Sequence, residues 1–159
     1  LLTRSANIYL AQRGDTHDDL AFIFSNLALA RRGVGDVTGA ERYFRRALRA
    51  AEVHENRLVA PILTDLADLR CVRGDHAEAM RLLDRAHPIM QKEYPDDAWR
   101  TAWVVNTRGG CLLRQKNLKA AAPLIRSSSP IILKRWPADA LYGYDAQRRM
   151  QALFTATRA

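Results

Sequence analysis

Residues 26–47 read NLALARRGVGDVTGAERYFRRA, and residues 65–86 read DLADLRCVRGDHAEAMRLLDRA, so the same pattern recurs after 39 residues. Each stretch contains a small residue, a Gly-Asp pair, an Ala, a large apolar residue four positions later and a further Ala. A third, more divergent copy follows after a step of 42 residues, in which the matching positions are Gly109, Asn117, Ala121, Ile125 and Ser128. Recurrence at a fixed period is typical of proteins built from stacked repeats.

The residue types in this pattern predict a helix, a tight turn and a second helix in each unit. Gly35 and Gly74 suit a left-handed residue at the end of the first helix. Asp36, Asp75 and Asn117 follow the turn and can cap the second helix. The small residues expected where the two helices cross closely are Ala28, Ala67 and Gly109 on the first helix and Ala40, Ala79 and Ala121 on the second.

Working outward from these turns gives an all-helical domain over residues 1–159. Helix pairs are expected over 18–53, 57–93 and 97–134, after the second helix of a truncated repeat at 1–14. A capping helix is expected over 138–157, with an apolar stripe made by Tyr142, Ala146, Met150, Leu153 and Phe154. The first residue is Leu1 rather than Met, and we therefore expect the chain to be a fragment of a larger protein.

The repeat resembles the tetratricopeptide repeat (TPR), and its length resembles that of the kinesin-light-chain type. The residues that carry the resemblance are Leu27, Ala28, Ala40, Phe44 and Ala47, and again Leu66, Ala67, Ala79, Leu83 and Ala86. The resemblance implies an all-α, TPR-like α-α superhelix, which is a right-handed solenoid of antiparallel helix pairs with a C-terminal capping helix.

The C-terminal part of the chain, from Trp99 through Gly109-Gly110-Cys111 to Leu153-Phe154, is similar to the C-terminal TPR region of bacterial eukaryotic-like serine/threonine kinases. This similarity implies a regulatory or recruitment domain of a bacterial signalling protein. The cytoplasm is the favoured compartment, or the periplasm if the parent protein has a membrane span.

A TPR-like array implies a binding groove that is lined by the first helix of each pair, and a protein or peptide as partner. A homodimer is a second arrangement that the sequence leaves open. In kinesin-light-chain-like repeats an Asn in the position of Asn26 is expected to hydrogen-bond a peptide backbone. The expected groove residues are Asn26, Leu29, Arg32, Thr64, Asp65, Asp68, Trp103, Asn106 and Arg114.

The charge of the chain suggests an alternative partner. There are 25 Lys and Arg against 17 Asp and Glu, which gives a formal net charge of +8, and a basic helical-repeat module could bind nucleic acid. However, no aromatic residues interleave a basic cluster, as stacking on bases requires. No stretch approaches the ~20 apolar residues of a membrane span. The sequence thus favours a protein partner over nucleic acid and predicts no membrane contact.

We expect no catalytic activity in this chain. It contains no phosphate-binding glycine loop, no dinucleotide-binding motif, no H-E-x-x-H and no G-x-S-x-G. Cys71 and Cys111 lie among apolar helical residues and are expected to be buried free thiols. No Cys or His residues recur at zinc-finger spacing, and the sequence therefore predicts neither a metal ion nor a cofactor.

Overall fold

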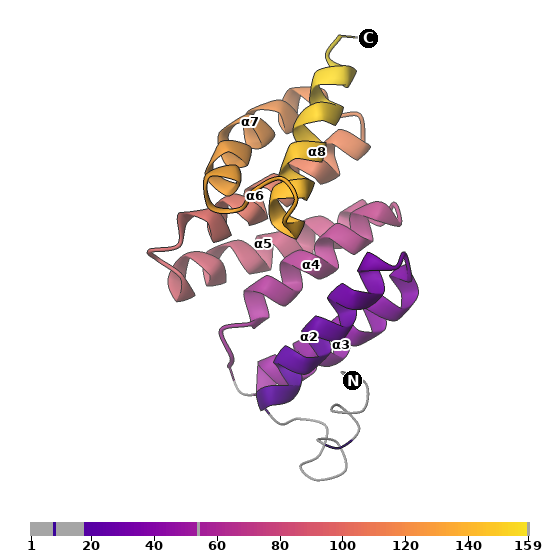
Figure 1. Cartoon of the computed structure of the whole chain (residues 1–159), viewed down its shortest axis with the longest axis vertical. Coiled ribbons are helices and arrows are strands. Elements are labelled where there is room, and N and C mark those ends of the chain that lie inside the picture. Colours follow the sequence, from indigo (N-terminus) through magenta and orange to yellow (C-terminus); the bar gives the residue numbers. More distant parts are fainter. Residues whose placement is uncertain (1–7, 9–17, 54, 159) are drawn as a thin grey trace.

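The computed structural model describes Ile8 and residues 18–53 and 55–158. Over this part of the chain the domain is all-α, with seven helices that pack sequentially in antiparallel pairs (Figure 1). The helices are α2 (Asp18–Gly33), α3 (Val37–Val53), α4 (Val59–Val72), α5 (His76–Glu93), α6 (Ala98–Arg114), α7 (Leu118–Arg135) and α8 (Leu141–Ala156). Apart from Ile8, the helix expected over 1–14 lies outside the described residues.

The turns inside the three helix pairs have the same backbone geometry. Gly35, Gly74 and Lys116 have positive φ angles of 79°, 84° and 61°. The N–H of the next residue donates across the turn to the carbonyl five positions back: Asp36 to Arg31, Asp75 to Arg70, and Asn117 to Leu112. This is the Schellman arrangement, which satisfies the last carbonyls of a helix. The predicted left-handed turns are confirmed, and the third one forms with Lys116 in place of Gly.

The side chains predicted to cap the second helices also do so. Asp36 accepts a hydrogen bond from the N–H of Gly39 at 2.8 Å, and Asp75 accepts one from the N–H of Glu78 at 3.3 Å. In the third pair Asn117 accepts one from the N–H of Ala120 at 3.2 Å. Each cap satisfies an N–H that has no partner within its own helix, so the chain reverses direction sharply and begins the next helix at once.

Small residues allow the two helices of each pair to approach closely. Ala28 and Ala40 are fully buried in the first pair, and Ala67 and Ala79 are fully buried in the second. In the third pair Gly109 replaces the first alanine, and a Cβ at this position would lie 2.7 Å from Cγ1 of Ile125. That distance is too short for an ordinary van der Waals contact, so α6 and α7 cross more closely than a side chain at residue 109 would allow.

An ion pair links the first helix pair to the second. Glu41 on α3 is 9% exposed and lies 2.7 Å from Arg70 and 2.9 Å from Arg73, both at the C-terminal end of α4. A buried carboxylate requires compensating charge, so Glu41 must stay within reach of these two arginines. This contact therefore restricts both the orientation of the two helix pairs and the distance between them.

Proline residues do not end the helices in which they occur. The sequence predicts a bend at Pro88, and a bend or break at Pro130. The structure shows α5 continuing past Pro88, and α7 continuing past both Pro123 and Pro130 as far as Arg135. In the residues that the structure describes, no helix is both long and apolar enough to cross a bilayer.

The final helix, α8, is shorter than predicted and buries a different face. Ala146 and Leu153 are buried as expected, but Met150 is 38% exposed and Phe154 is 55% exposed. Asp145 and Arg149 are buried in their place. The expected apolar stripe of α8 is therefore wrong at two of its positions. The face that α8 turns toward the rest of the protein is partly charged.

The close approach of α6 and α7 predicts the effect of adding one methyl group. Gly109→Ala should lower the free energy of unfolding by about 1–3 kcal/mol, because the new Cβ must displace Ile125 or the backbone of α7. Gly33→Ala is the matched control: no atom lies within 4 Å of its new Cβ, and the better helix propensity of Ala should leave stability unchanged or raise it by up to ~1 kcal/mol. Urea denaturation of both variants measures the difference. Equal midpoints would contradict the close crossing.

Candidate functional site

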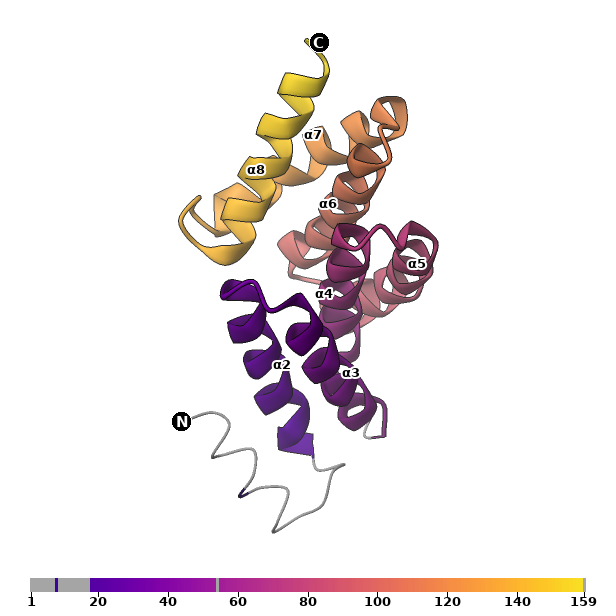
Figure 2. The same ribbon diagram turned by 90° about the vertical axis from the view of Figure 1, so that its right-hand side faces the viewer.

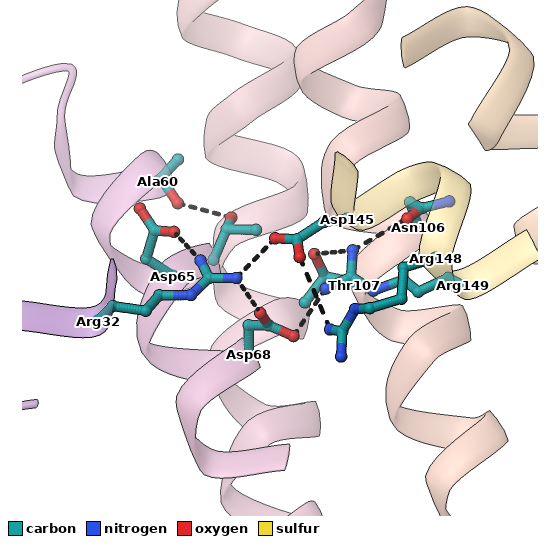
Figure 3. Close-up of polar contacts among 10 residues, drawn as sticks. Arg32, Ala60, Asp65, Asp68, Asn106, Thr107, Asp145, Arg148 and Arg149 are labelled. Carbon is teal, nitrogen blue, oxygen red and sulfur yellow. Dashed lines mark hydrogen bonds and ion pairs between the residues drawn. The ribbon is translucent and has the colours of Figure 1, made fainter. Parts of the chain in front are cut away.

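The most unusual feature of the structure is a buried polar network where α8 meets three other helices. Figure 2 shows α8 on the same side of the molecule as α2. Asp145 and Arg149 lie four positions apart on α8, so both point from the same face of the helix. Their partners come from α2, α4 and α6. We call the set the interhelix network; its members are Arg32, Asp65, Asp68, Asn106, Thr107, Asp145 and Arg149 (Figure 3).

Arg32 at the end of α2 is the centre of one half of this network. Its guanidinium lies 2.6 Å from Asp145 on α8, 2.8 Å from Asp68 on α4 and 3.4 Å from Asp65 on α4. Burial alone would lower the pKa of Arg32, but the three carboxylates outweigh it and raise this pKa above its usual value. Arg32 therefore stays charged and ties α2 to both α4 and α8.

Arg149 on α8 is the centre of the other half. It is 6% exposed and lies 2.7 Å from Asp68. It also donates hydrogen bonds to Oδ1 of Asn106 at 2.9 Å and to Oγ1 of Thr107 at 3.5 Å. Asn106 is fully buried and donates in turn to Ser128 and Ser129 on α7, at 3.0 and 2.8 Å. The network thus runs without interruption from α2 to α7.

The charges in the network do not balance when every group is ionised. Among the buried groups two arginines face three carboxylates, and a third arginine, Arg148, lies 3.6 Å from Asp145 but is 45% exposed, so it offsets the remaining negative charge only in part. Burial raises the pKa of Asp65 to about 7, with the neighbouring carboxylates of Asp68 and Asp145 contributing in the same direction. Burial also opposes ionisation of Asp68, but Arg149 and Arg32 outweigh it and lower its pKa. Of these two carboxyl groups, Asp65 therefore takes up a proton more readily as the pH falls, and its protonation reduces the negative charge of the site.

Aromatic packing lies beside the network and holds the start of α8. The ring of Tyr142 lies 4.8 Å from that of Trp103 and 5.3 Å from that of Trp99, measured between centroids. Trp136 lies 5.5 Å from Trp99 and 5.7 Å from Tyr142. Aromatic pairs at these separations add packing energy beyond the buried area. The apolar cluster and the interhelix network together hold the N-terminal half of α8 in place.

The structure brings most of the predicted groove residues together, and most of them face α8. Arg32, Asp65, Asp68 and Asn106 belong to the interhelix network, and Trp103 contacts Tyr142 of α8. Thr64 is fully buried, and its hydroxyl donates to the carbonyl of Ala60 within α4. Asn26 and Leu29 are half-buried on α2, and Arg114 is exposed at the end of α6. A ligand that reached Asn106 would have to displace Arg149 first.

Sequence analysis missed Asp145 and Arg149, which complete the network from α8. A signal for Arg149 does exist in the sequence. Tyr142, Ala146, Arg149 and Leu153 follow one another at steps of four, three and four, which places them on one helical face. A charged residue in the middle of such a buried stripe indicates a buried partner of opposite charge.

A pocket of about 250 Å³ opens beside the network, between the end of α6 and α8. Its lining residues are Gly110, Leu113, Arg114, Arg148, Arg149 and Ala152. Arg149 is held by Asp68, and Arg148 lies 3.6 Å from Asp145 with 45% of its side chain exposed. Arg114 forms no hydrogen bond or ion pair with any described residue. We call this the arginine pocket.

Many of the other basic side chains are already paired, so the net charge of the chain overstates its free positive surface. Arg85 lies 2.6 Å from Glu52 and Arg108 lies 2.6 Å from Asp84. Arginines that form ion pairs in the described part of the chain also include Arg45, Arg70, Arg73, Arg81 and Arg100. Arg114 differs from these residues because it lines a pocket and forms no direct ion pair with a described residue, although its charge acts on Asp68.

The two cysteines are not the free thiols that the sequence predicted. Cys71 on α4 and Cys111 on α6 are joined as a disulfide, with their Cα atoms 5.4 Å apart, and both are buried. They are 40 residues apart in sequence. The prediction failed because only the stacking of one helix pair on the next places these two positions opposite each other.

Comparison with known proteins identifies no family. No protein-family model matches the chain, and a search of curated proteins finds no significant match. The repeat pattern and the geometry of the site are therefore the basis for any functional conclusion.

The charge imbalance predicts opposite effects for two similar substitutions. The pKa of Asp65 is higher in the folded chain than in the unfolded chain, so the folded protein binds more protons and loses stability as pH rises from about 4 to about 7. Asp65→Asn removes this pH-dependent loss of stability and should stabilise the protein at pH 8 by about 1–3 kcal/mol, with little effect at pH 4.

Asp68→Asn weakens contacts to two arginines and should destabilise the protein by about 3–5 kcal/mol at pH 8. Urea denaturation across this pH range measures both variants. Destabilisation by Asp65→Asn at pH 8 would contradict the assignment of the proton to Asp65.

The network also predicts which α8 arginine holds that helix. Arg149→Met removes one of the two arginines that pair with Asp68, and it removes the side chain that donates to Oδ1 of Asn106, so it should destabilise the protein by about 3–5 kcal/mol. Arg148→Met removes only a long, half-exposed contact and should cost less than ~1 kcal/mol. Hydrogen exchange should show faster opening of α8 in the first variant alone. Similar exchange in both variants would mean that aromatic packing, and not Arg149, holds α8.

Proposed function

We propose that this chain is a protein-interaction module of the TPR-like class, in which antiparallel helix pairs stack into a right-handed solenoid. Three observations support this proposal. The turns of the three pairs share the same hydrogen bonds, small residues lie at each crossing, and the pairs follow one another at steps of 39 and 42 residues. Repeats of this kind act through extended surfaces and not through catalytic clefts.

The side chains that contact α8 indicate which chemical groups the inner face of the array can bind. Arg32, Asp68 and Asn106 come from three successive first helices and contact one face of α8. A row of polar groups on successive repeats is suited to a segment that crosses them. We infer that a protein partner binds next to α8, at the part of this face that α8 leaves open.

The observation that carries the proposal is the arginine pocket. Arg114 is exposed and lies among the predicted groove residues, and although its charge helps to lower the pKa of Asp68, it forms no direct ion pair in the described chain. Arg148 and the buried Arg149 share its pocket, and Leu113 and Ala152 provide apolar surface. A guanidinium group binds carboxylates in a bidentate, geometrically specific manner. The partner that fits is a protein segment with an acidic side chain next to an apolar one.

We infer a signalling role only from the resemblance of the C-terminal part to TPR regions of bacterial serine/threonine kinases. The domain would then recruit a substrate or a regulator to the parent protein. Binding of nucleic acid is the alternative that the net charge of +8 suggests. The arginine pocket favours protein, because its basic groups surround a small apolar depression and form no track along which a phosphate backbone could run.

A selection experiment tests the proposal directly. Peptides selected on this chain from a random peptide display library should be enriched in Asp and Glu next to apolar residues. In fluorescence anisotropy, Arg114→Gln should weaken a selected peptide roughly 10- to 100-fold, as loss of a charge-assisted hydrogen bond predicts. Arg49→Gln is the matched control, because it removes the same charge from an exposed position on α3 that does not line the pocket.

Three results would contradict the proposal: no acidic preference, equal losses in both variants, or no peptide binding. If labelled single-stranded RNA bound instead, with an affinity that fell steeply as salt was added, the nucleic-acid alternative would replace it.

A further inference from the structure

Three side chains with metal-binding atoms meet where α4, α5 and α6 come together. They are Cys71 near the end of α4, His76 at the start of α5, and Cys111 on α6. Their ligand atoms all lie within 4.8 Å of one another. The residues come from three helices and two helix pairs, which is why no sequence spacing indicated the cluster.

The imidazole of His76 is the part of this cluster that a disulfide does not explain. Its Nδ1 is shielded from solvent and has no hydrogen-bond partner in the part of the chain that the structure describes. Buried nitrogen and oxygen atoms in folded proteins are almost always hydrogen-bonded or coordinated. A disulfide between Cys71 and Cys111 leaves this nitrogen without a role, whereas a metal ion bound by the two sulfurs would give it one.

The three ligand atoms are close enough together to share one metal ion. In a zinc site the Zn–S distance is about 2.3 Å and the Zn–N distance is about 2.0–2.1 Å, which places ligand atoms about 3.5–3.8 Å apart. The three ligand atoms here all lie within 4.8 Å of one another, and once the disulfide is reduced, rotation of the cysteine side chains can open the sulfur–sulfur distance to this range. The Cα atoms of the two cysteines are 5.4 Å apart, so both sulfurs can reach a shared ion.

The charge and type of the ligands select the metal. Two thiolates and an imidazole are soft or borderline ligands, which zinc and copper prefer over calcium or magnesium. A divalent ion makes the buried site neutral, whereas monovalent copper would leave an excess negative charge.

Next to His76 a pocket of about 480 Å³ gives access for a water molecule. Its lining residues are His76, Ala77, Met80, Arg108, Leu112 and Gln115.

We propose that the reduced chain binds one zinc ion through Sγ of Cys71, Sγ of Cys111 and Nδ1 of His76, with water from this pocket as the fourth ligand. Zinc and the disulfide exclude each other, because the disulfide removes both thiolates. Dipyridyl disulfide converts one form to the other: it accepts two electrons from the thiolates and leaves as two thiopyridine molecules. The Cys71–Cys111 bond forms, and the zinc ion is released.

Titration of the reduced chain with Co²⁺ under anaerobic conditions tests the site. The expected result is one bound ion per chain, with the ultraviolet charge-transfer bands of thiolate–cobalt bonds and the visible bands of tetrahedral cobalt. Added Zn²⁺ should remove these bands. Treatment with dipyridyl disulfide should release the zinc to a chromophoric chelator.

Two variants separate coordination from a general effect on folding. His76→Ala changes a residue at the first position of a helix and should weaken Co²⁺ binding roughly tenfold or more, with the helical circular dichroism signal retained. His87→Ala removes a histidine from the same helix, outside the cluster, and should bind as the unchanged chain does. Absence of thiolate–cobalt bands in the reduced chain would overturn the proposal, and so would equal affinity in His76→Ala.

Discussion

The position of α8 depends on the need to neutralise charge inside the protein. Arg32 and Arg149 are shielded from water by the helices that they join, and each must have a carboxylate partner. Apolar packing is not directional and would tolerate α8 at several angles on the aromatic cluster. The contacts of Asp145 with Arg32 and of Arg149 with Asp68 are satisfied at only one of these angles. A buried ion network of this kind contributes little net stability, and we attribute to it the choice of a single arrangement.

This arrangement has a consequence for recognition. α8 is part of the same chain, so its effective concentration beside α2, α4 and α6 exceeds that of any free ligand. A partner that competed for Asp68 or Asn106 would also have to leave Arg149 without its buried contacts. Recognition at an adjacent exposed group avoids that cost. Arg114 is such a group, because it lies next to the network without belonging to it.

Local chemistry determines how much of this structure the sequence could predict. The turns at Gly35 and Gly74 and their caps were predictable because they involve residues close together in the chain. The helix pairs followed from the spacing of small and large apolar residues. The interhelix network was only partly predictable, because Arg32 and Asp145 are 113 residues apart and meet only after the array has formed. The polar residues of α2, α4 and α6 that the repeat pattern predicts to be open to a ligand are mostly covered by α8.

The two cysteines of the metal-binding cluster lie on α4 and α6, which also carry residues of the network. Cys71 lies three residues after Asp68 on α4, and Cys111 lies four residues after Thr107 on α6, so the cluster is one helical turn from the contacts of Arg149. A zinc ion holds two sulfurs about 3.8 Å apart, and a disulfide holds them about 2.05 Å apart. Because Arg149 already joins α4 to α6, we expect the cysteine side-chain torsions to absorb this difference. α4 and α6 can then be joined either by a zinc ion or by the disulfide, while α8 and the arginine pocket keep their positions.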